Sequence, residues 1–158
     1  MQKKASDSGF TLLEIMMVVL IVTILVSIVI TSMMFFIARS RDRGRKSDLA
    51  RIKAALEMYR SVNKSYPSSL YSALCPTPSG LTDSNGTEYL KKLPCDPSTK
   101  SDYSYTPSPA GCTTACTSYS LYACLENATD TQKDDPIKTS PLDCSAAPFG
   151  ASYTIIEQ

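Results

Sequence analysis

The sequence predicts an α+β fold in which one long N-terminal helix packs, through its second half, on a small antiparallel β-sheet stapled by disulfides. Three observations support this prediction. They are an unbroken apolar run near the N-terminus, a three- and four-residue apolar spacing beyond it, and alternating residues in the C-terminal half. The chain has 158 residues, and the part beyond the apolar run is long enough for one small domain.

The apolar run is long enough to cross a membrane as a helix. Residues 15–30 include only Thr23 and Ser27 as polar residues, and the run continues to Ala38. About 20 apolar residues suffice to span a bilayer. A secretory signal peptide has a shorter apolar region followed by a small-residue cleavage site, and no such site interrupts this run before Arg39. We therefore predict a retained membrane helix.

The charges on the two sides of this helix favour opposite orientations. Lys3 and Lys4 precede it, whereas a more basic group follows it. This basic group consists of Arg39, Arg41, Arg43, Arg45 and Lys46. A simple count of basic residues would place the basic group in the cytoplasm. We predict the opposite topology, because long following domains translocate largely regardless of charge and because every cysteine lies in this domain.

Beyond the membrane segment the helix stays amphipathic and is predicted to continue to about Lys64. Its apolar positions recur at three- and four-residue steps: Leu49, Ile52, Leu56, Tyr59 and Val62. Asn63 and the Tyr66-Pro67 pair end the helical pattern, because the residue before a proline disfavours helical backbone.

A connection rich in Ser, Pro and Gly follows at residues 65–98, with short helical turns expected at 69–74 and 88–93. Residues 101–126 alternate as β-strands do, and Pro107 to Gly111 suits a hairpin turn between two strands.

The C-terminal part of the chain is expected to contribute one more strand. Residues 153–156 are predicted to form an edge strand, whereas residues 127–149 are polar and predicted to be irregular.

Six cysteines lie beyond the membrane segment, at Cys75, Cys95, Cys112, Cys116, Cys124 and Cys144. An even number confined to one side predicts disulfides in an oxidising compartment. Six cysteines allow 15 pairings. We favour Cys75–Cys95, Cys112–Cys116 and Cys124–Cys144, because each pair joins sequence neighbours and none crosses another. A zinc site is the alternative, but the chain has no His and no pair of CxxC motifs.

The start of the apolar run carries a family resemblance. Gly9-Phe10-Thr11-Leu12-Leu13-Glu14 is similar to the processing site and N-terminal helix of type IV pilin and type II secretion pseudopilin precursors. Further similarity in the globular part comes from Tyr66-Pro67, Tyr89-Leu90-x-x-Leu93-Pro94, Asp96-Pro97 and Tyr103-Ser104-Tyr105. The chain departs from the family in its many cysteines, and in having Thr23 and Thr31 where the family often has Gly or Pro.

The resemblance implies three regions. Residues 1–9 form a prepilin leader, residues 10–38 form the transmembrane and assembly helix segment, and residues 39–158 form the extracytoplasmic globular pilin domain with the second half of the helix. It also implies cleavage between Gly9 and Phe10 and N-methylation of Phe10.

The position of Glu14 in the apolar run allows two interpretations. It lies near one end of the apolar run and could extend its carboxylate to the membrane interface. A carboxylate deeper in hydrocarbon costs a few kcal/mol unless it is paired. The resemblance favours the second reading, in which Glu14 pairs with the new α-amine of Phe10 on a neighbouring subunit and sets the axial register of a helical assembly.

Two charged groups are candidates for ligand binding. The basic group could contact nucleic acid or lipid, but its alternate spacing distributes the arginines around a helix, so we expect a solvated collar and no DNA contact. Major pseudopilins carry a calcium loop near the position of Glu126, Asp130, Asp134 and Asp135. The pattern is not matched residue by residue, so Asp130, Asp134 and Asp135 are weak candidates and we expect no cofactor.

Composition excludes several functions. The absence of His leaves no Ser-His or Cys-His pair, no glycine-rich phosphate loop occurs, and the formal net charge is only +1, so we expect no enzyme and no strongly charged partner.

The function implied by the resemblance is a structural subunit of a membrane-rooted helical filament, either a type IV pilus or a type II secretion-like pseudopilus. Expected partners are further copies of the chain, a prepilin peptidase, an inner-membrane assembly platform, minor pilins and membrane lipid. The chain would cross the inner membrane once, and the filament would lie in the periplasm or at the cell surface. The alternative is a monomeric, signal-anchored extracytoplasmic domain that binds a ligand or partner.

Overall fold

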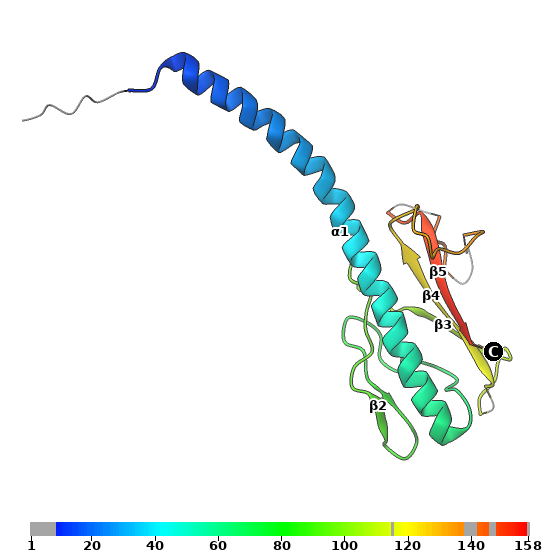
Figure 1. Cartoon of the computed structure of the whole chain (residues 1–158). Helices are drawn as coiled ribbons and strands as arrows, with labels where there is room; N and C mark the ends of the chain where they lie inside the picture. The colour runs from blue at the N-terminus through cyan, green and yellow to red at the C-terminus, as the bar shows by residue number, and fades with distance from the viewer. Residues whose placement is uncertain (1–8, 115, 138–141, 146–147, 158) are drawn as a thin grey trace, which may run out of the picture. The chain divides into compact units, whose positions relative to one another are not determined.

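The fold is α+β, with one long helix and two small antiparallel sheets (Figure 1). The computed structural model describes residues 9–114, 116–137, 142–145 and 148–157, without the side chains of residues 31 and 32. The predicted leader residues 1–8, including Lys3 and Lys4, lie outside these ranges. The elements are α1 (Leu12–Asn63), β1 (Leu81–Thr82), β2 (Glu88–Leu90), β3 (Ser104–Ser108), β4 (Ser118–Leu125) and β5 (Ala151–Glu157).

The chain divides into two compact units, residues 1–37 and residues 38–158. In the first unit, α1 exposes the large apolar side chains of its membrane-length segment. By length and composition, α1 is the one helix in the described ranges that could cross a membrane. The hydroxyl groups of Thr23 and Ser27 donate hydrogen bonds to the carbonyls of Leu20 and Ile24, at 2.8 and 2.7 Å. These two hydroxyl groups are thus paired within the helix, as a hydrocarbon environment requires.

In the second unit, α1 supplies one side of the hydrophobic core. Leu49, Ile52 and Leu56 are fully buried and pack with residues of both sheets, as the apolar spacing predicted. Val62 was assigned to the same face but is exposed. The reason is geometric, because each three-residue step rotates about 60° short of a full turn, and two such steps after Leu56 carry Val62 off the face.

The end of α1 lies where the sequence predicted it. Asn63 is the last helical residue, and Lys64 follows with a left-handed φ of 61°. The Lys64 amide still donates to the Arg60 carbonyl at 2.8 Å, which satisfies one of the free carbonyls at the helix end. Tyr66 then pairs with Cys116 in an isolated antiparallel bridge.

The larger sheet has the order β3-β4-β5, with every neighbouring pair antiparallel. The central strand, β4, buries Tyr119, Leu121 and Ala123 toward the core, which confirms the predicted alternation. β5 is an edge strand, also as predicted. The hairpin turn was placed too early, because β3 continues through Pro107, which pairs with Tyr119. An edge strand such as β3 tolerates a proline because one side of its backbone has no partner strand.

The two helical turns expected in the connection are wrong. Residues 88–90 form β2, which pairs with β1 around a turn at Asn85-Gly86. Gly86 has a φ of +82°, and the Asp83 carboxylate accepts the amides of Asn85 and Thr87, both at 2.9 Å. The Asn-Gly pair is a strong hairpin signal that outweighs the weak helical pattern.

No helix is present at residues 69–74 in the described ranges. The Tyr71 hydroxyl donates to the Pro94 carbonyl at 2.9 Å, and the buried Leu70 joins the core. These two tertiary contacts hold the segment in an irregular path.

Three disulfides join Cys75 to Cys95, Cys112 to Cys116 and Cys124 to Cys144. They are the same pairs that the sequence analysis favoured. The first joins the residues before β1 to those after β2, and the third ties the C-terminal segment to β4. The residues between elements are therefore held by covalent bonds where regular secondary structure is absent.

Candidate functional site

The first candidate site is the start of α1. Gly9, Phe10 and Thr11 precede the helix without regular secondary structure, and Phe10 is 78% exposed. The Thr11 hydroxyl accepts a hydrogen bond from the Glu14 amide at 3.2 Å, which makes Thr11 the N-cap of α1. The backbone bond between Gly9 and Phe10 therefore lies just outside the helix.

Gly9 has no structural role that the described residues reveal. A Cβ atom added at this position would meet nothing within 4 Å. The described residues therefore place no limit on the size of the side chain at this position.

The pair Thr11 and Glu14 has a local role that the sequence analysis missed. Thr-x-x-Glu has the spacing of a capping box, and an acidic residue in the first turn favours the positive end of the helix dipole. Because Thr11 lies after the Gly9–Phe10 bond, the cap would remain after cleavage. The Thr-x-x-Glu spacing is the sequence signal for this cap, whereas the family resemblance concerns only the charge of Glu14.

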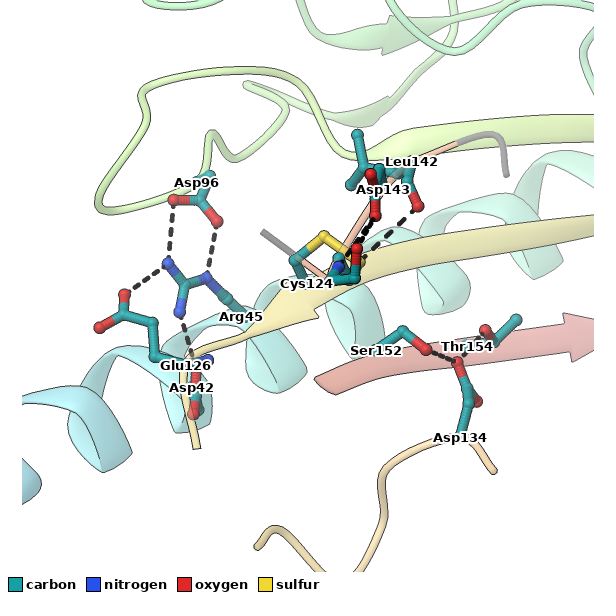
Figure 2. Close-up of a disulfide and its surroundings, with 12 residues drawn as sticks. Asp42, Arg45, Asp96, Cys124, Glu126, Asp134, Leu142, Asp143, Ser152 and Thr154 are labelled. Atoms are coloured by element: carbon teal, nitrogen blue, oxygen red, sulfur yellow. Dashed lines mark hydrogen bonds and ion pairs between the residues drawn. A yellow bond between two sulfur atoms is a disulfide. The ribbon is translucent and has the colours of Figure 1, made fainter. Parts of the chain in front are cut away.

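The second candidate site is a buried ion cluster around Arg45, shown in Figure 2. Arg45 is 0% exposed. Its guanidinium group donates to Asp42 at 2.7 Å, to Asp96 at 2.6 and 3.2 Å, and to Glu126 at 2.9 Å. The Phe149 ring covers it, with 5.2 Å between the ring centre and the guanidinium carbon. One side chain of α1 thus connects the helix to the loop before β3 and to the end of β4.

Asp42 and Arg41 extend this cluster. The Asp42 carboxylate accepts the backbone amides of Glu126 and Asn127, at 3.0 and 2.8 Å. Arg41 forms an ion pair with Glu126 through two nitrogen atoms. The segment that leaves β4 is therefore held against α1 by its backbone as well as by its side chains.

The cluster changes the pKa values of its acids. Burial by itself would raise the pKa of Glu126, but hydrogen bonds from Arg41, Arg45 and Ser98 lower it from 4.5 to about 2. The same balance lowers the pKa of Asp96, where Arg45 and the amides of Thr99 and Ser98 oppose burial. Both acids are thus charged at neutral pH, and the cluster is an ion network rather than a set of neutral hydrogen bonds.

The structure corrects the expectation of a uniformly solvated basic collar. Arg45 is buried, and Arg41 and Lys46 are engaged with acids of the C-terminal segment. Only Arg39 and Arg43 match the expectation, since both are exposed. Burial of Arg45 depends on Asp96 and Glu126, which are far away in sequence, so spacing alone could not reveal it.

The three weak calcium candidates contact different groups. Asp130 pairs with Lys46 at 2.5 Å, Asp134 accepts the hydroxyls of Ser152 and Thr154 at 2.7 and 2.6 Å (Figure 2), and Asp135 is exposed. Within the described ranges, no group of three or more His, Cys, Asp or Glu side chains is arranged to hold a metal ion.

The start of the chain and its fold together define a class. A membrane-length helix that follows directly after Gly9-Phe10-Thr11 and continues into a disulfide-bonded α+β domain is the organisation of a pilin-like protein. The family described as "Prokaryotic N-terminal methylation motif" matches residues 4–36. The family described as "Type II secretion system (T2SS), protein G" matches residues 33–137. The chain belongs to this second family.

Curated relatives agree with the family match. Type II secretion system core protein G of Pseudomonas aeruginosa is 41% identical over 100 residues, which are 60% of this chain and 70% of the relative. Its counterpart in Vibrio cholerae is 35% identical over 109 residues, 66% of this chain and 74% of the relative. That of Escherichia coli K12 is 37% identical over 103 residues, 60% of this chain and 70% of the relative. No solved structure matches the chain.

Proposed function

We propose that this chain is a structural subunit of a type II secretion pseudopilus and that it assembles through its N-terminal helix after loss of a leader. The observation that carries the proposal is the start of α1, where an exposed Gly9–Phe10 junction directly precedes a capped, membrane-length helix with one early carboxylate. Membership of the protein G family supports the secretion pseudopilus over a type IV pilus.

Cleavage would convert Phe10 into a new N-terminus with an α-amine. In our proposal a membrane prepilin peptidase cuts the Gly9–Phe10 bond, and Phe10 is then N-methylated. The α-amine and Glu14 are then the two charged groups near the start of an otherwise apolar helix. In hydrocarbon each would be costly alone, so pairing the amine of one copy with Glu14 of another lowers the free energy of both.

This pairing would fix the axial offset between neighbouring helices. The apolar side chains exposed along the first unit supply most of the contact area, but apolar contact alone tolerates sliding. A single ion pair at a defined position is the element that distinguishes one offset from another. Glu14 therefore acts in our proposal as a register residue, and its cap with Thr11 keeps the helix start ordered.

The globular unit would lie outside the cytoplasm, where its three disulfides can persist. The ion cluster around Arg45 holds the C-terminal segment to α1, so the surface offered to other copies is fixed. The remaining partners that we propose are the inner-membrane assembly platform and minor pilins. This role requires no catalysis by the chain itself.

The test separates assembly from simple anchoring. The full chain is expressed with its secretion system, and the mass of the protein in sheared, pelleted material is measured. We expect loss of the first nine residues and co-sedimentation with filaments. A Gly9→Lys variant should accumulate uncleaved, whereas Gly9→Ala should be processed. The fold leaves space for either side chain at position 9, so a difference between the two variants would arise in the peptidase. Assembled protein that retains its leader, or a protein that stays monomeric in detergent, would support the anchored-domain alternative.

A further inference from the structure

The basic group on α1 is divided between two faces of the helix. Arg41 and Arg45 are engaged by carboxylates of the globular unit, and Lys46 by Asp130. Arg41 and Arg45 lie on one face of the helix. Arg39 and Arg43 share the other face, on which Lys46 also lies, because residues three and four apart are neighbours. Neither forms an ion pair or a hydrogen bond with any residue in the ranges that the structure describes. Arg39 and Arg43 are therefore neighbours on the helix surface, and their N–H groups have no partner among the described residues.

These two arginines line an open cleft of about 260 Å³ together with the segment that follows β4. The other lining residues are Asn127, Thr129, Asp130 and Thr131. A water molecule occupies about 30 Å³ in the liquid, so the cleft is large enough to take a phosphate group.

The cleft has an excess of positive charge despite its one acid. Asp130 is paired with Lys46 at 2.5 Å and also accepts the Gln132 amide at 2.8 Å. Its charge is therefore already compensated, and the charges of Arg39 and Arg43 are not. A cleft lined by two such arginines and by Thr131 suits a small anion, because guanidinium groups bind phosphate oxygens in pairs.

We propose that this cleft binds the phosphate of an anionic lipid headgroup. Arg39 follows Ala38, the last residue of the apolar run, and Arg43 lies about one helical turn further. When the run crosses a bilayer, both guanidinium groups fall at the level of the headgroups. The proposal rests on the membrane anchoring of the chain, and it is independent of leader cleavage and of filament assembly. A lipid bound in this way would hold the subunit in the membrane until assembly withdraws it.

The experiment measures lipid binding by the full chain purified in detergent. Phosphatidylglycerol is titrated and the lipid-bound fraction is read by native mass spectrometry, with phosphatidylcholine and inorganic phosphate in separate arms. The test variant is Arg39→Gln/Arg43→Gln. Its matched control, Arg51→Gln/Lys92→Gln, removes the same charge from exposed positions outside the cleft. Near-UV circular dichroism checks that both variants keep the native fold.

We expect the test variant to bind phosphatidylglycerol at least tenfold more weakly than the unchanged chain, and the control to differ by less than twofold. Phosphatidylcholine should bind weakly to all three proteins, and millimolar inorganic phosphate should not displace the lipid. An Arg39→Lys/Arg43→Lys variant should bind more weakly than the unchanged chain, because lysine cannot make the paired contacts.

Four results would overturn the proposal. Equal losses in the test and control variants would reduce the effect to net charge, and full binding by the lysine variant would remove the role of the guanidinium groups. Displacement by inorganic phosphate would assign the cleft to free anions. Unchanged lipid binding by the Arg39→Gln/Arg43→Gln variant would show that the cleft does not hold the lipid phosphate.

Discussion

The guanidinium group of Arg45 on α1 donates two hydrogen bonds to the carboxylate of Asp96, a residue 51 positions further along the chain, and both side chains are buried. The same group also reaches Asp42 and Glu126. A single cation thus satisfies three acids from three parts of the chain. Removing it would leave buried charges without a partner, which costs far more than the pairing itself contributes.

Arg45→Met should therefore destabilise the protein by about 3–5 kcal/mol, because it leaves the carboxylates of Asp96 and Asp42 uncompensated. Chemical denaturation of the full chain in detergent, followed by near-UV circular dichroism, measures the change. Arg51→Met is the matched control, since Arg51 is an exposed arginine of the same helix, and it should change stability by about 0.5 kcal/mol or less. Equal effects of the two substitutions would contradict the role assigned to the cluster.

Stability should fall in acid because of Glu126. Its pKa is lowered from 4.5 to about 2 in the folded chain, so its contribution is fully present above pH 4.5 and is lost as the pH falls toward 2. A shift of this size corresponds to about 3 kcal/mol. Denaturation at a series of pH values should show the loss, and Glu126→Gln should flatten the profile between pH 5 and about pH 2. A profile unchanged by this substitution would show that Glu126 is not the responsible acid.

Glu14→Ala should leave the subunit inserted and folded but impair assembly. The change removes the proposed partner of the Phe10 amine, while the Thr11 hydroxyl can still accept the amide of residue 14. Glu14→Gln keeps the shape without the charge and should be equally defective. Filament yield in sheared fractions is the measurement, with membrane-bound protein as the control for insertion. A normal yield from either variant would be decisive against the register role.

Loss of the Cys75–Cys95 bond should destabilise the globular unit by about 2–3 kcal/mol, because the closed loop would gain conformational freedom in the unfolded chain. Thermal or chemical unfolding of the full chain with Cys75→Ser and Cys95→Ser measures the effect. Peptide mapping without reduction tests the pairing itself. Recovery of Cys75 bonded to any other cysteine would refute the arrangement, and free thiols throughout would revive the zinc and cytoplasmic interpretations.

Calcium should have little effect on this chain. Lys46 compensates Asp130, and the hydroxyls of Ser152 and Thr154 bind Asp134, so neither acid has the open coordination that calcium requires. We expect the melting temperature in excess calcium to match that in a chelator within about 1 °C, less than a change of 1 kcal/mol would produce. A clear rise with calcium, absent in Asp130→Asn and not reproduced by magnesium, would instead establish a site.

Local patterns in the sequence determined much of the fold. The apolar run and the spacing of Leu49, Ile52 and Leu56 specify α1, because helical periodicity depends on residues three and four apart. The alternation of buried and less buried residues likewise specifies β4, because successive side chains of a strand point to opposite faces. The Gly9-Phe10 junction and Glu14 could be found as a motif, because they lie within one continuous stretch of six residues. The β1–β2 hairpin was missed although Asn85-Gly86 encodes it locally.

Only the tertiary structure decided which charges the fold uses. The sequence places Arg41 and Arg45 on one face of α1 and Arg39 and Arg43 on another, but it does not say which face the domain covers. Covering the first face brings Asp96 and Glu126 onto Arg45, whereas the second face is left to line an open cleft. The physical reason is that burial of a charge is stable only when distant partners arrive together, and that depends on the packing of the whole domain.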